Sequence, residues 1–342
     1  MRPISVILDI TDRCNLRCRM CHFSSTDRIS FPPYATSGPM PVELFERIAR
    51  EYFPHAKRVV LGSAAEPLMH PQFADIVTIA GRYNVPDLWF PTNLIPLTEH
   101  TAKAIVDAKV NTVGVSIDGV RKETYETIRV GATWERLMEK LELLRSSRPA
   151  KRPNIRLTFT WMRANRDEIH EMPAFAESIG ATELDVRLIA PAQGADVSGQ
   201  LLTGDTLHDE LMSVARDAVR RGLRLMAYPK LTSHPRGWIE RAAWRFWRIR
   251  AGLDRFEHLG ALKQERTIGC RYPDTTYVIR PSGAVFPCQY YDHAIGFAGS
   301  DPMLSITGGV KLKAIREGLK CGSPVGACST CGPQRRDSIY QV

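Results

Sequence analysis

The 342-residue sequence lacks long hydrophobic runs and any segment typical of export. No stretch approaches the ~18 consecutive apolar residues of a membrane-spanning helix, so we expect no transmembrane segment. The first residues include Arg2, Asp9 and Asp12 and contain no long apolar core of a secretory signal. Short-period repeats, low-complexity tracts and recognisable nucleic-acid-binding modules are also missing. These absences favour a globular cytoplasmic protein that does not bind nucleic acid.

The charge balance is basic, with 46 Lys and Arg residues against 37 Asp and Glu residues and a net charge of +9. Such an excess would favour an anionic substrate, such as a sugar phosphate, a nucleotide sugar or a uronic acid. It is equally compatible with a general effect on solubility, since net charge does not specify an activity. The length suits one large domain with a smaller one attached.

Strand-like and helix-like segments alternate over the first two thirds of the chain. Strands are predicted near 5–10, 57–62, 87–91, 111–117, 154–161 and 182–189, and helices near 41–49, 72–82, 99–108, 133–147, 167–179 and 206–221. Six such units predict an α/β fold, an open (β/α)6 partial TIM barrel whose functional residues lie at the C-terminal strand ends. We expect the barrel over residues 1–228, a helical bridge over 229–265 and a small α+β extension over 266–342.

The predicted bridge contains an amphipathic helix over 236–252. Apolar residues beginning with Trp238 share one face, and Arg241, Arg245 and Arg248 share another. This pattern is typical of a plain bridging helix with a solvated Arg face. A lid that grips an anionic substrate and a helix that lies on a membrane surface are the alternatives.

Three of the eight cysteines stand in the spacing C-x3-C-x2-C directly after the first predicted strand: Cys14, Cys18 and Cys21. Three thiolates on one short loop can hold an iron–sulfur cube by three corners and leave one iron open for chemistry. The alternative is a zinc knuckle with His22 as fourth ligand, although neighbouring Cys21 and His22 would bind one tetrahedral ion awkwardly.

This loop resembles the signature of the radical S-adenosylmethionine (SAM) enzymes. In that family SAM chelates the open iron of a 4Fe–4S cluster, and its reductive cleavage gives a 5′-deoxyadenosyl radical that takes a hydrogen atom from the substrate. Four later segments, 62–71, 90–93, 113–119 and 125–131, resemble further family motifs in the same order, with Ala64-Ala65 in place of two glycines. The resemblance implies SAM contacts from Met20, Phe23, Ala65, Glu66, Asn93, Ser116, Asp118 and Arg129. Among these, Glu66 would hold the SAM ammonium; an exposed strand-end Glu is the alternative.

The other five cysteines fall in the last 75 residues: Cys270, Cys288, Cys321, Cys328 and Cys331. Cys270 and Cys288 flank a predicted hairpin over 275–286, which would bring both thiols to one metal centre. Cys328 and Cys331 form a C-x2-C pair. A zinc ribbon would use four such cysteines as well. Eight cysteines in metal-type motifs indicate a reducing compartment rather than disulfides.

This region resembles the C-terminal extension called SPASM in its full form and Twitch in its shorter form. Five cysteines suit the shorter form, which implies one auxiliary 4Fe–4S cluster held by Cys270, Cys288, Cys328 and Cys331. Cys321 is left as a replacement ligand, a buried bystander or a hydrogen-atom donor to a substrate radical.

The family resemblance implies a radical SAM oxidoreductase acting on a small polar substrate, such as a sugar, cyclitol or nucleoside. We expect two-electron oxidation of an alcohol or amine carbon, with the auxiliary cluster accepting an electron and a flavodoxin or ferredoxin as reductant. Redox-neutral epimerisation or decarboxylation, peptide or protein maturation, and a non-enzymatic zinc or electron-carrier role are the alternatives. Candidate bases, chosen by position alone, are Asp292 and also Asp185, Arg187, Tyr290 and His293.

Overall fold

The computed structural model describes residues 3–21, 38–189, 197–204, 206–228, 270, 272–329 and 331. Phe23, His22 and the predicted bridge over 229–265 lie outside the described residues. The division of the chain at 228 and 266 therefore stays a prediction.

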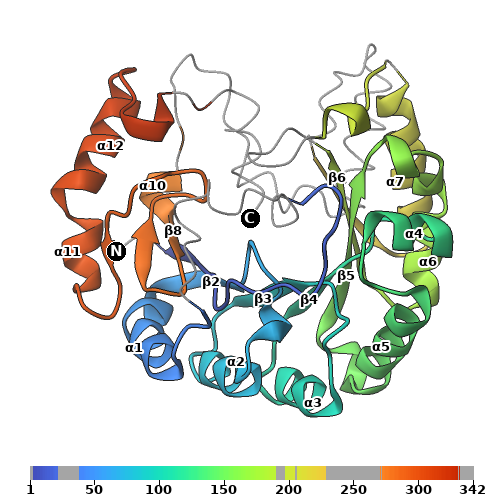
Figure 1. Ribbon diagram of the computed structural model, residues 1–342, viewed down its shortest axis with the longest axis horizontal. Coiled ribbons are helices and arrows are strands. Elements are labelled where there is room, and N and C mark those ends of the chain that lie inside the picture. The colour runs from blue at the N-terminus through green and yellow to red at the C-terminus, as the bar shows by residue number, and fades with distance from the viewer. Residues whose placement is uncertain are drawn as a thin grey trace.

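Seven parallel strands follow one another along a curved sheet (Figure 1). They are β1 (Ile4–Leu8), β2 (Ala56–Leu61), β3 (Asp87–Thr92), β4 (Thr112–Ser116), β5 (Asn154–Trp161), β6 (Glu183–Leu188) and β7 (Arg224–Tyr228). The six predicted strands are confirmed, within a residue or two at their ends. The seventh, β7, was not predicted, because it is short and begins with a charged residue.

Helices cover the outer face of this sheet (Figure 1). They are α1 (Val42–Tyr52), α2 (Phe73–Gly81), α3 (Glu99–Asp107), α4 (Lys122–Ile128), α5 (Trp134–Ser146), α6 (Met172–Ser178) and α7 (Leu207–Arg220). Short 3₁₀ turns are η4 (Phe53–His55), η5 (Pro67–Met69), η6 (Pro149–Lys151), η7 (Arg163–Asn165), η8 (Asp167–His170) and η9 (Ser198–Gln200). Thr98 and Thr133 cap α3 and α5 by accepting hydrogen bonds from backbone N–H groups three residues on. The predicted α/β alternation is confirmed.

Strand side chains alternate between two environments, as a pleated sheet requires. Val59, Leu61 and Phe90 join the large core between sheet and helices. Ile7, Val60 and Trp89 point the other way and form a second apolar cluster with Val278 and Phe286 of the C-terminal region. The concave side of the barrel is therefore filled partly by residues of the extension.

The extension continues the sheet of the barrel. It consists of α10 (Tyr272–Thr275), β8 (Thr276–Ile279), β9 (Ala284–Phe286), β10 (Gly296–Phe297), α11 (Met303–Thr307), α12 (Val310–Lys320) and the 3₁₀ turn η10 (Gly326–Cys328). β8 pairs in parallel with β1, and β9 pairs antiparallel with β8, so the predicted hairpin is confirmed. Gly283 in its turn has φ +87°, and a Cβ there would lie 2.8 Å from the Ala298 carbonyl oxygen, which explains the glycine.

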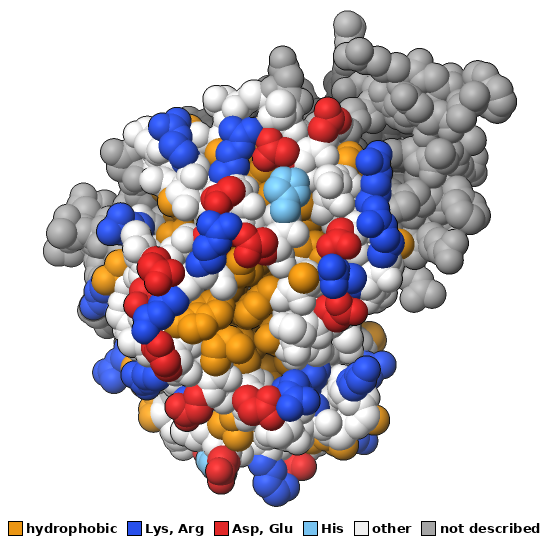
Figure 2. All heavy atoms as spheres, turned by 90° about the vertical axis from the view of Figure 1, so that its right-hand side faces the viewer, with side chains coloured by type: hydrophobic (Ala, Val, Ile, Leu, Met, Phe, Trp, Pro, Cys, Tyr) orange, Lys and Arg blue, Asp and Glu red, His pale blue; other side chains and the backbone are white. Residues whose placement is uncertain are grey.

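Figure 2 looks onto the face that carries α4 to α7, where apolar side chains gather and charged side chains of both signs surround them. Ion pairs on these elements include Arg121–Asp167 at 2.8 Å, Arg166–Glu210 at 2.5 Å and Arg221–Glu177 at 2.6 Å. Among the described helices, none is long and apolar enough to cross a membrane.

Candidate active site

The three cysteines of the N-terminal motif lie together in the loop after β1. Cys18 is buried and Cys14 and Cys21 are partly buried, and the Cys21 N–H donates to the Cys18 carbonyl at 3.0 Å. The loop is tied to the end of α4, because Arg19 N–H donates to the Ile128 carbonyl at 3.0 Å. Burial, together with the nearby Glu66, Cys18 and Cys21, raises the pKa of Cys14 to about 11. Three thiolates would therefore need a cationic group between them, which fits an iron–sulfur cluster.

Glu66 is a buried carboxylate next to this loop, and not an exposed strand-end residue. Its Oε1 accepts hydrogen bonds from the Thr92 hydroxyl at 2.6 Å and Leu68 N–H at 3.1 Å, and Oε2 accepts from Asn93 N–H at 2.6 Å. Burial outweighs these donors and raises the pKa of Glu66 to about 7. A cation brought to this carboxylate would favour its ionised form.

Asn93 links this carboxylate to the cysteine loop. Its side-chain amide donates to Asn15 Oδ1 at 2.9 Å and lies 4.0 Å from Cys14 Sγ. The Thr-Asn turn at the end of β3 therefore contacts both the cysteine loop and Glu66.

Asp118 and Arg129 form a buried ion pair, with Arg129 Nη2 2.5 Å from Asp118 Oδ2. Arg129 Nη1 also approaches Cys18 Sγ at 3.9 Å, and Asp118 Oδ1 accepts a hydrogen bond from Thr160 N–H at 2.7 Å. Burial raises the pKa of the Cys18 thiol, and the charge of Arg129 opposes this effect. The pair places one guanidinium beside a cysteine of the motif.

The remaining predicted SAM contacts lie around the same strand ends. Ser116 is the last residue of β4 and is partly buried, as is Ala65 in the loop after β2. Met20 packs against a small cluster that contains Ile128, Met162 and Ile189.

Asp9 belongs to this site although sequence reasoning did not select it. Asp9 Oδ1 accepts hydrogen bonds from Ser63 N–H at 2.6 Å, the Ser63 hydroxyl at 2.8 Å and Ala64 N–H at 3.2 Å. Asp9 is 1% exposed, and it pairs with Arg280, which is fully buried. A charge inside the apolar run Ile7-Leu8-Asp9-Ile10 was the available signal, because a buried charge needs a partner.

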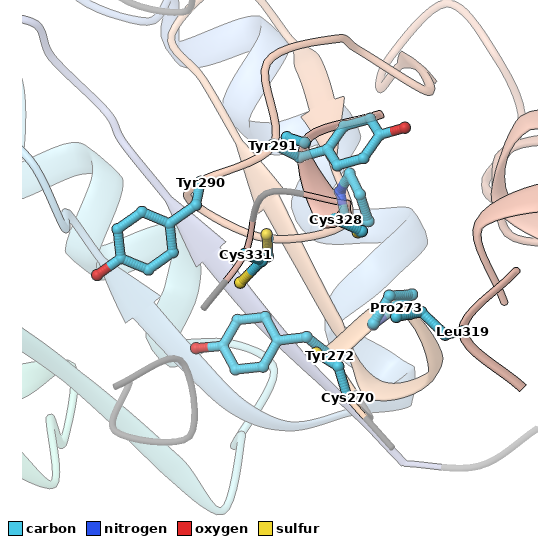
Figure 3. Close-up of a pocket in the computed structure, with 11 residues that line it drawn as sticks. Cys270, Tyr272, Pro273, Tyr290, Tyr291, Leu319, Cys328 and Cys331 are labelled. Carbon is cyan, nitrogen blue, oxygen red and sulfur yellow. The ribbon is translucent and has the colours of Figure 1, made fainter. Parts of the chain in front are cut away.

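Four cysteines of the C-terminal group line one pocket: Cys270, Cys288, Cys328 and Cys331 (Figure 3). Tyr272, Tyr290 and Tyr291 line the same pocket. Burial, together with the neighbouring Cys270 and Cys328, raises the pKa of Cys288 to about 12. Four thiols around one buried pocket fit a four-cysteine metal centre. In the part of the chain that the structure describes, no group of three or more His, Cys, Asp or Glu side chains is arranged so that it could hold a single metal ion.

Two predicted catalytic candidates lie at the surface. Cys321 follows α12, is exposed and is not among the residues that line the cysteine pocket. Asp292 is half-exposed and pairs with exposed His293 at 2.8 Å. In contrast, Asp185 on β6 is buried and pairs with Arg187 at 2.7 Å.

Residues 8–171 match the family model of the radical SAM superfamily. This part of the chain is therefore similar to the radical SAM superfamily. The matched radical SAM region includes the three-cysteine motif, Glu66, Asn93, Asp118 and Arg129.

Two curated relatives are similar over part of their length. The tungsten-containing aldehyde ferredoxin oxidoreductase cofactor-modifying protein of Pyrococcus furiosus is 26% identical over 225 residues, 62% of this chain and 60% of that protein. A probable GTP 3′,8-cyclase of Methanosarcina mazei is 31% identical over 169 residues, 49% of each chain. The chain thus spans about half to three fifths of these relatives.

Among solved structures, SuiB of Streptococcus suis bound to SAM has a TM-score of 0.67 at 15% identity. The match covers 92% of this chain and 68% of SuiB. This likeness concerns the fold, and it extends well beyond residue 171.

Proposed function

We propose that the chain is a radical SAM enzyme whose first cluster is a 4Fe–4S cube held by Cys14, Cys18 and Cys21. The observation that carries this proposal is the contact of the three-thiol loop with two buried charged groups, Glu66 and the Asp118–Arg129 pair. When bound, the reduced cluster and SAM supply methionine and a 5′-deoxyadenosyl radical.

The residues of the chain would hold SAM by its charges. Glu66 would accept from the ammonium, because a carboxylate with the Asn93 and Thr92 donors already in place is pre-oriented. Arg129 would face the SAM carboxylate while Asp118 holds its guanidinium, and Asp118 and Ser116 would lie near the ribose. Ala65 and Met20, together with Phe23 outside the described residues, would complete the site.

We propose a second 4Fe–4S cluster in the pocket lined by Cys270, Cys288, Cys328 and Cys331, as in a Twitch-type extension. The proposed reaction is two-electron oxidation of an alcohol or amine carbon in a small polar substrate. A base would remove a proton from the substrate after the radical has taken a hydrogen atom, and a cluster held by these four cysteines would supply the acceptor for the remaining electron. A flavodoxin or ferredoxin would supply the electron that starts each turnover.

The position of Arg187 supports the proposal that the substrate carries an anionic group. It lies next to the last residue of β6, its side chain is 32% exposed, and buried Asp185 orients its guanidinium through contacts at 2.7 and 3.1 Å. A guanidinium at a C-terminal strand end is suited to a carboxylate or phosphate. The eight cysteines stand in metal-type motifs, which supports a reducing compartment, the cytoplasm.

The test is anaerobic reconstitution with iron, sulfide, SAM and reductant, followed by a screen of sugars, cyclitols, nucleosides and peptides. We expect substrate-dependent 5′-deoxyadenosine and a product two electrons more oxidised than the substrate, a ketone or an imine. A product at the substrate's oxidation level would replace oxidation by epimerisation or decarboxylation. Turnover of peptides alone would indicate a maturase. Binding of zinc and no iron would refute the proposal that the chain is a radical SAM enzyme.

A further inference from the structure

The Asp9–Arg280 pair joins two parts of the molecule that have separate proposed roles. Asp9 holds the start of the segment that contains Glu66, through its three hydrogen bonds with Ser63 and Ala64. Arg280 follows β8 of the extension, and its Nη1 donates to the other carboxylate oxygen of Asp9. Both side chains are buried, at 0% and 2% exposure.

Arg280 also contacts the residues that lead into the cysteine pocket. Its Nη2 donates to the Gln289 carbonyl at 3.5 Å, and its guanidinium lies over the Phe286 ring at 5.6 Å. Gln289 adjoins Cys288, which lines the pocket. A single planar guanidinium thus connects the Cys288 loop to the carboxylate that orients Ser63 and Ala64.

We propose that Asp9 and Arg280 are a positioning pair that couples the auxiliary cysteine pocket to the Ser63–Glu66 segment. Occupation of the pocket orders Cys288 and Gln289, and through Arg280 and Asp9 it orders the backbone that precedes Glu66. A buried ion pair transmits such a shift because separating its charges is costly. A guanidinium transmits it better than an ammonium, since its donors are held in one plane. The effect on SAM rests on the proposed function, whereas the coupling itself does not.

Backbone contacts run in parallel with this pair and must be separated from it. Asp9 N–H donates to the Ile279 carbonyl at 2.9 Å, and β8 pairs with β1 along its length. Arg280→Lys leaves these contacts in place and keeps the buried positive charge. It removes the second donor, which reaches Gln289.

A matched control exists at the opposite end of the barrel. Arg156, near the start of β5, pairs with buried Glu183 at 2.7 Å and lies over the Trp89 ring at 4.9 Å. Arg156→Lys therefore makes the same chemical change in the same kind of environment. It touches neither the cysteine pocket nor the Ser63–Glu66 segment.

The experiment measures hydrogen–deuterium exchange of residues 62–66 in anaerobically reconstituted full-length protein. We compare wild type with Arg280→Lys, Cys288→Ser, the variant that carries both changes, and the control Arg156→Lys. The dissociation constant of SAM is measured on the same samples. We expect exchange of residues 62–66 to be about tenfold faster in Arg280→Lys and in Cys288→Ser, equivalent to about 1.4 kcal/mol of opening free energy. The double variant should be no faster than either single variant, and SAM binding should weaken in parallel.

Several results would overturn the coupling. The first is exchange of residues 62–66 that Arg280→Lys leaves unchanged. The second is a rate in the double variant that equals the product of the effects of the two single variants. The third is an equally large change in exchange in Arg156→Lys. If Arg280→Lys does not fold, Phe286→Leu loosens the guanidinium and leaves the ion pair, and it should show the same effect at smaller size. If the variants change the exchange of residues 62–66 as predicted but the protein does not bind SAM, the proposed function is refuted and the coupling stands.

Discussion

The replacement Glu66→Gln should weaken SAM binding by an amount that depends on pH. A hydrogen bond to a charged group contributes about 1.5–3 kcal/mol, so loss of the Glu66 carboxylate should raise the SAM dissociation constant about 10- to 150-fold when Glu66 is ionised. The pKa of Glu66 is about 7 because burial raises it. Wild-type Glu66 is therefore mostly ionised at pH 8 and mostly neutral at pH 6.

The pKa of Glu66 sets the direction in which SAM affinity changes with pH. As pH falls through 7, wild type loses the carboxylate, whereas the Gln variant has nothing to lose at this position. The ratio of the variant's dissociation constant to that of wild type should fall about tenfold between pH 8 and pH 6. Taking the ratio cancels proton effects that both proteins share, such as those of SAM itself. Since burial favours neutral Glu66, its contribution to folding stability is largest below pH 4.5 and declines as pH rises to 7.

The assay is equilibrium binding of SAM to anaerobically reconstituted protein at intervals of half a pH unit. Glu183→Gln is the control. Glu183 is also a buried carboxylate, but it lies at the N-terminal end of β6, away from the proposed SAM site, and pairs with Arg156. It should lower the melting temperature and leave SAM binding unchanged. A ratio that stays constant from pH 6 to pH 8 would show that Glu66 does not hold the SAM ammonium.

Three further outcomes are expected. Cys14→Ala should lower bound iron from about eight to about four per chain and abolish SAM cleavage, measured by iron analysis and 5′-deoxyadenosine formation; an unchanged iron content would contradict the ligand assignment. Asp118→Asn leaves the charge of buried Arg129 without its partner, so it should lower the free energy of unfolding by about 3–5 kcal/mol in denaturant titrations; a loss below 1 kcal/mol would argue against the pair. Arg187→Ala should raise KM at least tenfold for an anionic substrate and leave KM unchanged for a neutral analogue, and equal effects on both would remove Arg187 from substrate recognition.

Local sequence patterns predicted the elements well, because helices and strands differ in the period of their apolar residues. The strands β1 to β6, the helices α1 to α3 and α5 to α7, and the hairpin of β8 and β9 appear near the expected positions, whereas α4 was not predicted. The four cysteines that line the C-terminal pocket were selected through the resemblance to a Twitch-type extension. A hairpin and a C-x2-C pair are local features, which a sequence pattern can indicate.

Long-range partners could not be predicted in the same way. The pairing of β8 with β1 joins residues about 270 positions apart, and no local pattern states which strand an edge will accept. Asp9 and Arg280 stood in the sequence as two unrelated charges. Only the parallel alignment of their strands brings them together, because each residue follows the C-terminal end of its strand.

The position of β8 beside β1 also constrains how the chain can be made. β1 is synthesised long before β8, yet one of its edges stays open until residues 276–279 have been added. At about 5–20 residues per second, that wait lasts roughly 15–50 s. An open strand edge readily pairs with other chains. Fragments that stop before β8 should therefore aggregate during expression, and a chaperone that shields β1 in the nascent chain should raise the yield of this sequence.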